Sequence, residues 1–211
     1  MNKNYLDTIV KHYEDCLQKH GDSHLGVDWP KIEDVNTRYK VMLDIIKFAE
    51  DSSERVSLLD FGCGTGHLLE YISKNKIEHI EYSGLDISEK FISISKQKFS
   101  YVDFYCVDIL DNSVVLPDFD YVVMNGVFTE KRELNFDEMW EYFCKMLKRV
   151  FSLTIKGVAF NVISKAVDWE RDDLFHVPLD LLADFLTKHL TRNFIIRNDY
   201  GLYEFTTYIM K

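Results

Sequence analysis

The chain has 211 residues, of which 46% are hydrophobic and 28% charged, and its formal net charge is −10 at pH 7. This length suits one domain with an ordinary core, and the acidity disfavours nucleic acid as a partner, because such binding usually needs a basic surface. The sequence shows no membrane-spanning run, no signal peptide and no CxxC pair, so we expect a cytoplasmic protein without a metal site.

The first 50 residues predict helices and no strands. Apolar side chains recur at helical spacing over 2–20, a polar loop with flanking glycines covers 21–30, and a second helix is expected over 34–50. This segment therefore lies outside the pattern of the rest of the chain.

From residue 56 onward, short apolar runs alternate with amphipathic segments. Strands are expected at 56–61, 81–86, 102–108, 119–125, 151–162, 192–198 and 203–210, and helices at 66–75, 88–99, 136–149 and 178–189. Such alternation predicts right-handed crossovers and a mostly parallel sheet, to which the final hairpin adds an antiparallel strand. Ligands of these sheets bind at the carboxyl ends of the strands.

The segment "LLDFGCGTGHLLEYI" (58–72) places three glycines between a buried strand and a helix. Gly62 permits a sharp turn, Gly64 lets a ligand approach the backbone, and Gly66 opens a helix whose free N–H groups favour an anion. The spacing is one residue shorter than the GxGxxG of dinucleotide sites. Asp60, two residues before the first glycine, suits an ammonium group and would repel a pyrophosphate.

Two further acids are expected at strand ends. Asp86 can accept hydrogen bonds from both hydroxyls of a ribose, although it could instead cap the next helix. Asp108 can accept from an adenine amino group, with Ile87 and Ile109 on either side of the ring, or it could be a solvated acid. These positions indicate a nucleoside ligand.

In this order and spacing, the segments "LLDFGCGTGHLL", "YSGLDIS", "FYCVDIL" and "FDYVVMNGVF" resemble the four motifs of class I S-adenosylmethionine-dependent methyltransferases. The resemblance implies an α/β fold: a three-layer Rossmann-like sandwich with a mostly parallel seven-stranded sheet and one antiparallel C-terminal strand. It also implies a single methyltransferase domain over 1–211, with an N-terminal helical lid over 1–50 and the core over 56–211.

The resemblance also assigns the cofactor site. S-adenosylmethionine, which leaves as S-adenosylhomocysteine, would contact the chain through its methionine part at Asp60, Gly62, Cys63, Gly64, Gly66 and His67, its ribose at Asp86 and Ile87, its adenine at Asp108 and Ile109, and its methyl group at Asn125, Gly126 and Val127. His67 departs from the small or apolar residue expected there and could simply open the helix. Arg38 is expected to reach the cofactor carboxylate.

Methyl transfer often requires a base, which draws attention to histidine. His176 follows the fifth strand in an expected loop, "DWERDDLFHVP", and is the candidate general base, unless it only packs before Pro178. Arg171 would hold an anionic substrate or pair with a neighbouring acid. His24 and Trp29, in the N-terminal loop, are candidate substrate contacts, unless that loop is inert.

The predicted function is methyl transfer to an oxygen or nitrogen of a small molecule, without nucleic acid or membrane as partner. "MNGV" replaces the NPPY-type tetrad of enzymes that methylate base or glutamine nitrogens. The segment "KGVAFNVISKAVDWERDDLFH" resembles methyltransferases of polysaccharide biosynthesis and nucleotide-sugar metabolism. This implies a sugar-linked or phosphorylated acceptor, such as a capsule precursor, with phosphoramidate O-methylation as one case. The alternatives are an NAD-dependent oxidoreductase and a non-catalytic adaptor.

Overall fold

The computed structural model describes residues 3–48 and 55–211, with side chains from residue 6 onward. Its sheet runs in the order β3-β2-β1-β4-β5-β8-β7, and a two-residue strand, β6, pairs with β5 beside this path. The strands are β1 (Val56–Phe61), β2 (Ile80–Asp86), β3 (Phe104–Cys106), β4 (Phe119–Met124), β5 (Thr154–Ser164), β6 (His176–Val177), β7 (Phe194–Arg197) and β8 (Glu204–Met210). Among the described strands, β8 alone runs opposite to the direction of the others, which confirms the predicted mostly parallel α/β sandwich.

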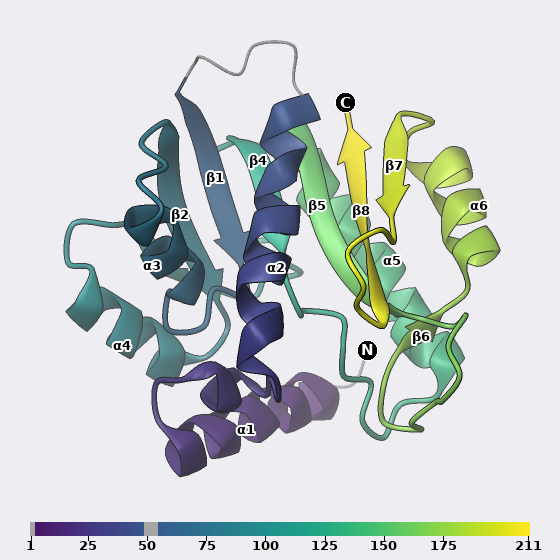
Figure 1. The fold of residues 1–211 in the computed structure, drawn as a ribbon, viewed down its shortest axis with the longest axis horizontal. Helices are drawn as coiled ribbons and strands as arrows, with labels where there is room; N and C mark the ends of the chain where they lie inside the picture. Colours follow the sequence, from purple (N-terminus) through teal and green to yellow (C-terminus); the bar gives the residue numbers. More distant parts are fainter. Residues whose placement is uncertain (1–2, 49–54) are drawn as a thin grey trace.

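Helices cover both faces of the sheet (Figure 1). They are α1 (Lys3–His20), α2 (Ile32–Leu43), α3 (His67–Lys74), α4 (Glu89–Lys98), α5 (Phe136–Ser152) and α6 (Leu179–His189), with 3₁₀ turns η1 (His24–Val27) and η2 (Asp44–Phe48). Among the described residues, no helix has both the length and the apolar character needed to cross a membrane.

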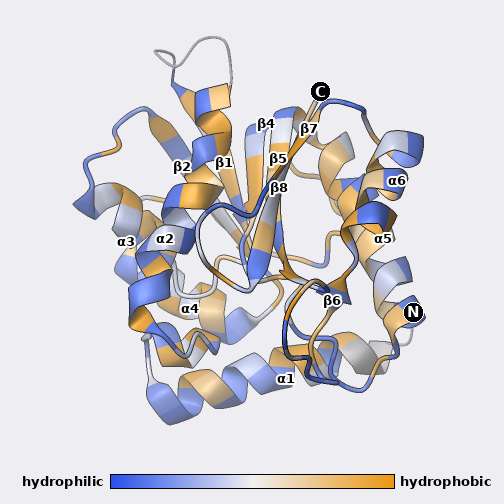
Figure 2. Ribbon diagram, turned by 45° about the vertical axis from the view of Figure 1, so that its right-hand side comes forward, coloured by the Kyte–Doolittle hydropathy of each residue, from blue (hydrophilic) through white to orange (hydrophobic). Residues whose placement is uncertain are grey.

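The two faces of the sheet bury separate apolar clusters because side chains alternate along each strand. Leu58 packs with Tyr121 and Tyr208 in the cluster under α2 and α3. Its neighbour Leu59 belongs to the opposite cluster, which includes Phe143 of α5 and residues of α6. Figure 2 shows orange, hydrophobic stretches along the central strands and both blue and orange residues on the helices around them. Period-two patterning thus accounts for the three layers.

Several boundaries differ from the predictions. The second helix begins at Ile32 and gives way to a 3₁₀ turn at Asp44, while residues 49–50 of its expected span lie outside the described residues. The third strand has only three residues, because the chain turns at Asp108, whose carboxylate accepts a hydrogen bond from the Leu110 N–H at 2.9 Å. The expected loop before Pro178 contains β6.

The parallel strands β1, β2 and β4 end at one edge of the sheet, and α1 lies across that edge (Figure 1). The topology therefore brings the residues that follow these strands together beneath the N-terminal segment.

Candidate active site

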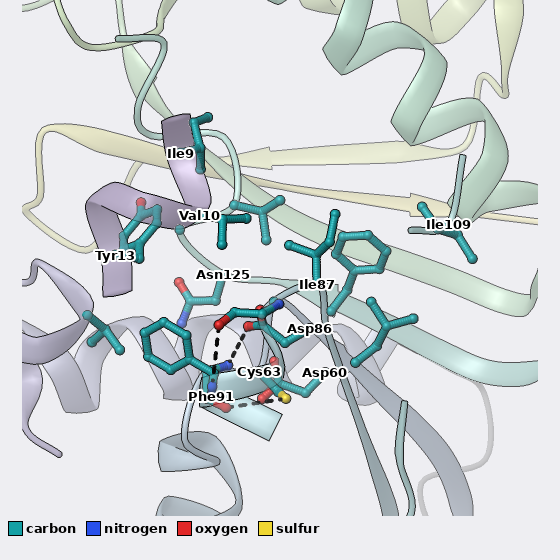
Figure 3. Close-up of a pocket in the computed structure, with 18 of the residues that line it drawn as sticks. Ile9, Val10, Tyr13, Asp60, Cys63, Asp86, Ile87, Phe91, Ile109 and Asn125 are labelled. Carbon is teal, nitrogen blue, oxygen red and sulfur yellow. Dashed lines mark hydrogen bonds between the residues drawn. The ribbon is translucent and has the colours of Figure 1, made fainter. Parts of the chain in front are cut away.

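A cavity lies at the carboxyl ends of β1, β2 and β4 (Figure 3). Most of the residues predicted for the site line it: Trp29, Asp60, Gly62, Cys63, Gly64, His67, Asp86, Ile87, Asp108, Ile109, Asn125, Gly126 and Val127. Gly66, Arg38, His24, Arg171 and His176 do not. Residues from positions 29 to 127 thus line one pocket. This agrees with the expectation that ligands bind at the carboxyl ends of the strands.

The glycine loop between β1 and α3 turns at positive φ, 75° at Gly62 and 84° at Gly66. A Cβ on Gly62 would lie 2.8 Å from Cγ2 of Val127, inside the cavity wall. A Cβ on Gly66 would instead lie 2.9 Å from the ring of Phe99. Gly66 therefore leaves room for the Phe99 ring; it precedes α3 as its N-cap, as predicted, and is not among the residues that line the cavity.

Asp60, at the end of β1, is 4% exposed. Its Oδ2 accepts a hydrogen bond from the Tyr82 hydroxyl at 2.7 Å. The pKa of Asp60 is raised to about 7, mainly by burial, against which the Tyr82 hydrogen bond acts, and also by the nearby negative charge of Asp86. A buried carboxyl that is easily ionised near neutral pH is well suited to a cationic partner.

Asp86 ends β2, and its carboxylate organises the surrounding backbone. One oxygen accepts from the Gly64 N–H at 3.0 Å and the other from the Ser88 N–H at 2.9 Å. Burial raises the pKa of Asp86, and these backbone hydrogen bonds oppose the shift. Ser88, whose Oγ accepts from Phe91 N–H, caps α4. Asp86 thus joins the glycine loop to the start of α4 while lining the cavity.

Asp108 and the two predicted isoleucines also line the cavity, and Figure 3 labels both isoleucines. Ile109 is buried, whereas Ile87 is 38% exposed. An apolar side chain that lines a pocket and is still exposed leaves a surface that a flat ring can cover. The arrangement is compatible with the predicted adenine contact.

Asn125, the first residue after β4, has both side-chain amide atoms buried without a hydrogen-bond partner among the described residues. Such unsatisfied groups are costly unless a ligand or water completes them. Asn125 lines the same cavity as Asp86 and Cys63 (Figure 3). The amide is therefore a strong sign that a polar ligand atom belongs here.

The backbone of the next residue, Gly126, is positioned by a series of hydrogen bonds between buried polar groups. Its N–H donates to Asn161 Oδ1 at 2.7 Å, and Asn161 Nδ2 donates to Glu204 Oε1 at 2.9 Å. Glu204 in turn accepts from Arg38 Nε at 3.0 Å, and Arg38 lies 5.1 Å from the centroid of Trp29. Arg38 is not among the residues that line the cavity, although its Nη1 is buried without a hydrogen-bond partner among the described residues, and its contact with the cofactor carboxylate stays a prediction.

The N-terminal segment forms one wall of the cavity, through Leu6, Ile9, Val10 and Tyr13 of α1 and Val27 and Trp29 of the following loop. Sequence reasoning predicted a lid but missed these α1 contacts, although Ile9 and Tyr13 belong to the apolar stripe visible in the sequence. Tyr142 and Met146 of α5 were also missed, because their helical spacing equally predicts core packing.

Polar contacts attach this segment to the core. Asp22 accepts hydrogen bonds from Thr65 Oγ1 at 2.5 Å and Lys98 Nζ at 2.7 Å, and lies 2.7 Å from His67 Nε2. Glu14 accepts from Ser88 Oγ at 2.7 Å. His67 thus both opens α3 and contacts the N-terminal segment.

The remaining candidates lie elsewhere. His176 is buried in β6, where Nδ1 lies 2.9 Å from Ser164 O and Nε2 accepts from the Arg171 N–H at 3.2 Å. Both ring nitrogens are therefore used by the backbone, outside the cavity. Arg171 pairs with Asp173, one of its expected alternatives. His24 contacts the Trp29 carbonyl at 2.6 Å and supports the loop without lining the cavity.

Known proteins are similar to this chain in sequence. A family model described as a methyltransferase domain matches residues 59–149. The Mycobacterium tuberculosis protein Rv1506c, which carries a provisional methyltransferase name, is 26% identical over 76% of this chain and 96% of its own length. A malonyl-[acyl-carrier protein] O-methyltransferase of Acetivibrio thermocellus is 30% identical over 41% of this chain and 30% of its own length.

Solved structures share the fold. Magnesium protoporphyrin IX methyltransferase from Synechocystis PCC 6803, crystallised with S-adenosylmethionine, has a TM-score of 0.62 at 17% identity and covers 97% of this chain and 96% of its own. The plantazolicin methyltransferase BpumL, crystallised with a desmethyl substrate analogue and S-adenosylhomocysteine, has a TM-score of 0.61 at 14% identity and covers 100% and 99%.

These findings favour neither an oxidoreductase nor a non-catalytic adaptor. The matched domain, the related sequences and the shared architecture agree with the motifs at the strand ends. Residues 59–149 match a methyltransferase domain, so the protein is an enzyme that uses S-adenosylmethionine as its methyl donor, and its fold is the one shared by the methyltransferase structures above.

Proposed function

We propose that the enzyme uses this cavity to transfer a methyl group from S-adenosylmethionine to an oxygen of a small metabolite. Asp60 would bind the cofactor ammonium, Asp86 the ribose hydroxyls, and Asp108 the adenine amino group between Ile87 and Ile109. The bound cofactor supplies an electrophilic methyl group on a positively charged sulfur. The buried carboxyl of Asp60 and the tight turn at Gly62 fit such a ligand.

The unpartnered amide of Asn125 is the observation that carries the acceptor proposal. Its nitrogen can donate to an acceptor oxygen and its oxygen can accept from a hydroxyl. The hydrogen-bonded chain from Gly126 through Asn161 to Glu204 holds the backbone beside it in place. Asn125 would therefore orient the acceptor toward the methyl group, which favours an in-line displacement.

The histidine content of the cavity favours an acceptor that is already ionised. His67 is the one imidazole among the described cavity residues, and it is hydrogen-bonded to Asp22 at the glycine loop. A carboxylate or phosphate oxygen needs no base at neutral pH. The Acetivibrio relative, named as an O-methyltransferase, supports oxygen as the target. We therefore favour a phosphorylated or otherwise acidic acceptor.

Within this class we retain the sugar-linked acceptors that the sequence resemblance implies, including capsule precursors and phosphoramidates. A small acceptor suits a cavity that has α1 as one wall. A small acceptor enters such a site more readily than a folded macromolecule does.

The test is transfer of labelled methyl from S-adenosylmethionine to a panel of sugar phosphates, nucleotide sugars, carboxylic acids and neutral sugars. We expect acidic members to react and Asn125→Ala to lower kcat at least tenfold with little change in cofactor affinity. Asn198→Ala, in the loop before β8, is the matched control. Labelling confined to neutral sugars, or full activity of Asn125→Ala, would contradict the proposal.

A further inference from the structure

Three side chains of different chemistry meet outside the cofactor cavity. His12 and Cys16 are one turn apart on α1, and Asp28 follows η1. His12 Nε2 lies 2.9 Å from Asp28 Oδ2 and 4.0 Å from Cys16 Sγ. Their imidazole nitrogen, thiol sulfur and carboxylate oxygen all lie within 4.8 Å of one another. The i, i+4 spacing brings the first two together, and the loop supplies the third.

We propose that His12, Cys16 and Asp28 bind a divalent ion of the zinc class. Nitrogen, thiolate and carboxylate donors together suit Zn²⁺. They do not suit Mg²⁺ or Ca²⁺, because these ions prefer oxygen ligands. Tetrahedral ligands of zinc lie roughly 3.2–3.8 Å apart, given bond lengths of about 2.0–2.3 Å. The cluster needs only small side-chain shifts to reach this geometry.

The charge around the cluster also favours a cation. Asp28 places a carboxylate oxygen 2.9 Å from His12 Nε2, so one negative charge is already part of the cluster. Binding would ionise the Cys16 thiol, release its proton to solvent and replace the hydrogen bond between His12 and Asp28 with two metal–ligand bonds. Solvent water would take the fourth position.

The position of the cluster gives the ion a structural consequence. Tyr13, the neighbour of His12, lines the cofactor cavity, and so do Val27 and Trp29, which flank Asp28. An ion bound to all three ligands would join α1 to this loop. It would thereby hold two parts of the cavity wall together, whichever acceptor the enzyme uses.

The experiment uses the full chain, treated with a chelator and free of cofactor, and titrates it with Co²⁺ and Zn²⁺ alone. We expect one equivalent of Zn²⁺ by calorimetry and a thiolate-to-cobalt absorption band. Cys16→Ser should abolish the band and weaken Zn²⁺ binding at least tenfold, and His12→Gln should weaken it similarly. Cys144→Ser, which removes another partly buried thiol, is the matched control and should keep both signals.

Circular dichroism and the thermal midpoint establish that each variant is folded, and Asp28→Asn provides a third variant on a different element. Absence of saturable Zn²⁺ binding by the wild-type chain would overturn the proposal. So would a cobalt band that persists in folded Cys16→Ser, or one that disappears in Cys144→Ser.

Discussion

The carboxyl edge of the sheet and the N-terminal segment contribute to the same cavity in different ways. On the sheet, Asp60, Asp86 and Asn125 stand at strand ends, so the backbone hydrogen bonds of three paired strands determine their positions. On the N-terminal side, Ile9 and Tyr13 are placed by helix packing, and polar contacts such as that of Asp22 attach the segment. The sheet therefore provides a binding surface fixed by strand pairing. The N-terminal segment provides a wall that is held by helix packing and side-chain contacts.

The largest effect should come from the sheet side. We expect Asp86→Ala to weaken S-adenosylhomocysteine binding by about 10- to 100-fold, or ~1.5–3 kcal/mol, because hydrogen bonds to a charged group are lost. Calorimetry measures this, with the exposed Asp103→Ala as control. Unchanged affinity in Asp86→Ala would show that the sheet edge is not the principal binding surface.

The second prediction concerns protonation at the same edge. The pKa of Asp60 is raised to about 7, so the carboxyl is largely neutral at pH 6 and must ionise to bind an ammonium group. Cofactor affinity should therefore rise about eightfold between pH 6 and pH 7.5, in proportion to the ionised fraction of Asp60. In the cofactor-free protein, the raised pKa means that the folded state binds this proton more tightly than the unfolded state does. The free energy of unfolding should therefore fall as pH rises from about 4 to 7.

Asp60→Asn cannot ionise, so calorimetry across this pH range should show a flat and weaker binding profile. Its unfolding free energy should also lose the contribution that falls between pH 4 and pH 7. If the cofactor affinity of the wild type stays constant or falls toward pH 7.5, Asp60 does not bind the ammonium group.

A smaller effect is expected on the N-terminal side. Asp22 is partly exposed, and exposed ion pairs each contribute little, so Asp22→Ala should accelerate cofactor release by only about threefold. Stopped-flow fluorescence of Trp29, which lines the cavity, reports this rate. Asp7→Ala, elsewhere on α1, is the control. A loss of affinity as large as that of Asp86→Ala would abolish the contrast between the two sides.

The smallest catalytic effect is expected at His176. Because both ring nitrogens contact the backbone outside the cavity, His176→Gln should leave kcat and its pH profile within about twofold of the wild type. The same variant should lower the free energy of unfolding by ~1–3 kcal/mol, because a buried hydrogen bond is lost. Loss of activity in a folded variant would restore His176 as a candidate base.

The contrast between the two sides also explains which features were predictable from sequence. Asp60, Gly62 and Asp86 could be placed because strand ends follow from local alternation and glycine spacing. Arg38 could not, because its partner Glu204 is 166 positions away. His176 has the chemistry of a base, yet only the pairing of β6 with β5 shows that its nitrogens are already used.

The missed residues of α1 have the same cause. Leu6 and Val10 read as ordinary apolar positions on an amphipathic helix, and nothing local distinguishes a helix that packs on a core from one that encloses a ligand. The fold was therefore more predictable than the site, and the cofactor half of the site more predictable than its N-terminal wall.

Because α1 is one wall of the cavity, we expect cofactor exchange to involve a movement of that helix. Each catalytic cycle then contains a mechanical step besides bond making, and such steps commonly limit turnover. If such a movement limits the rate, turnover should slow as the viscosity of the solvent is raised.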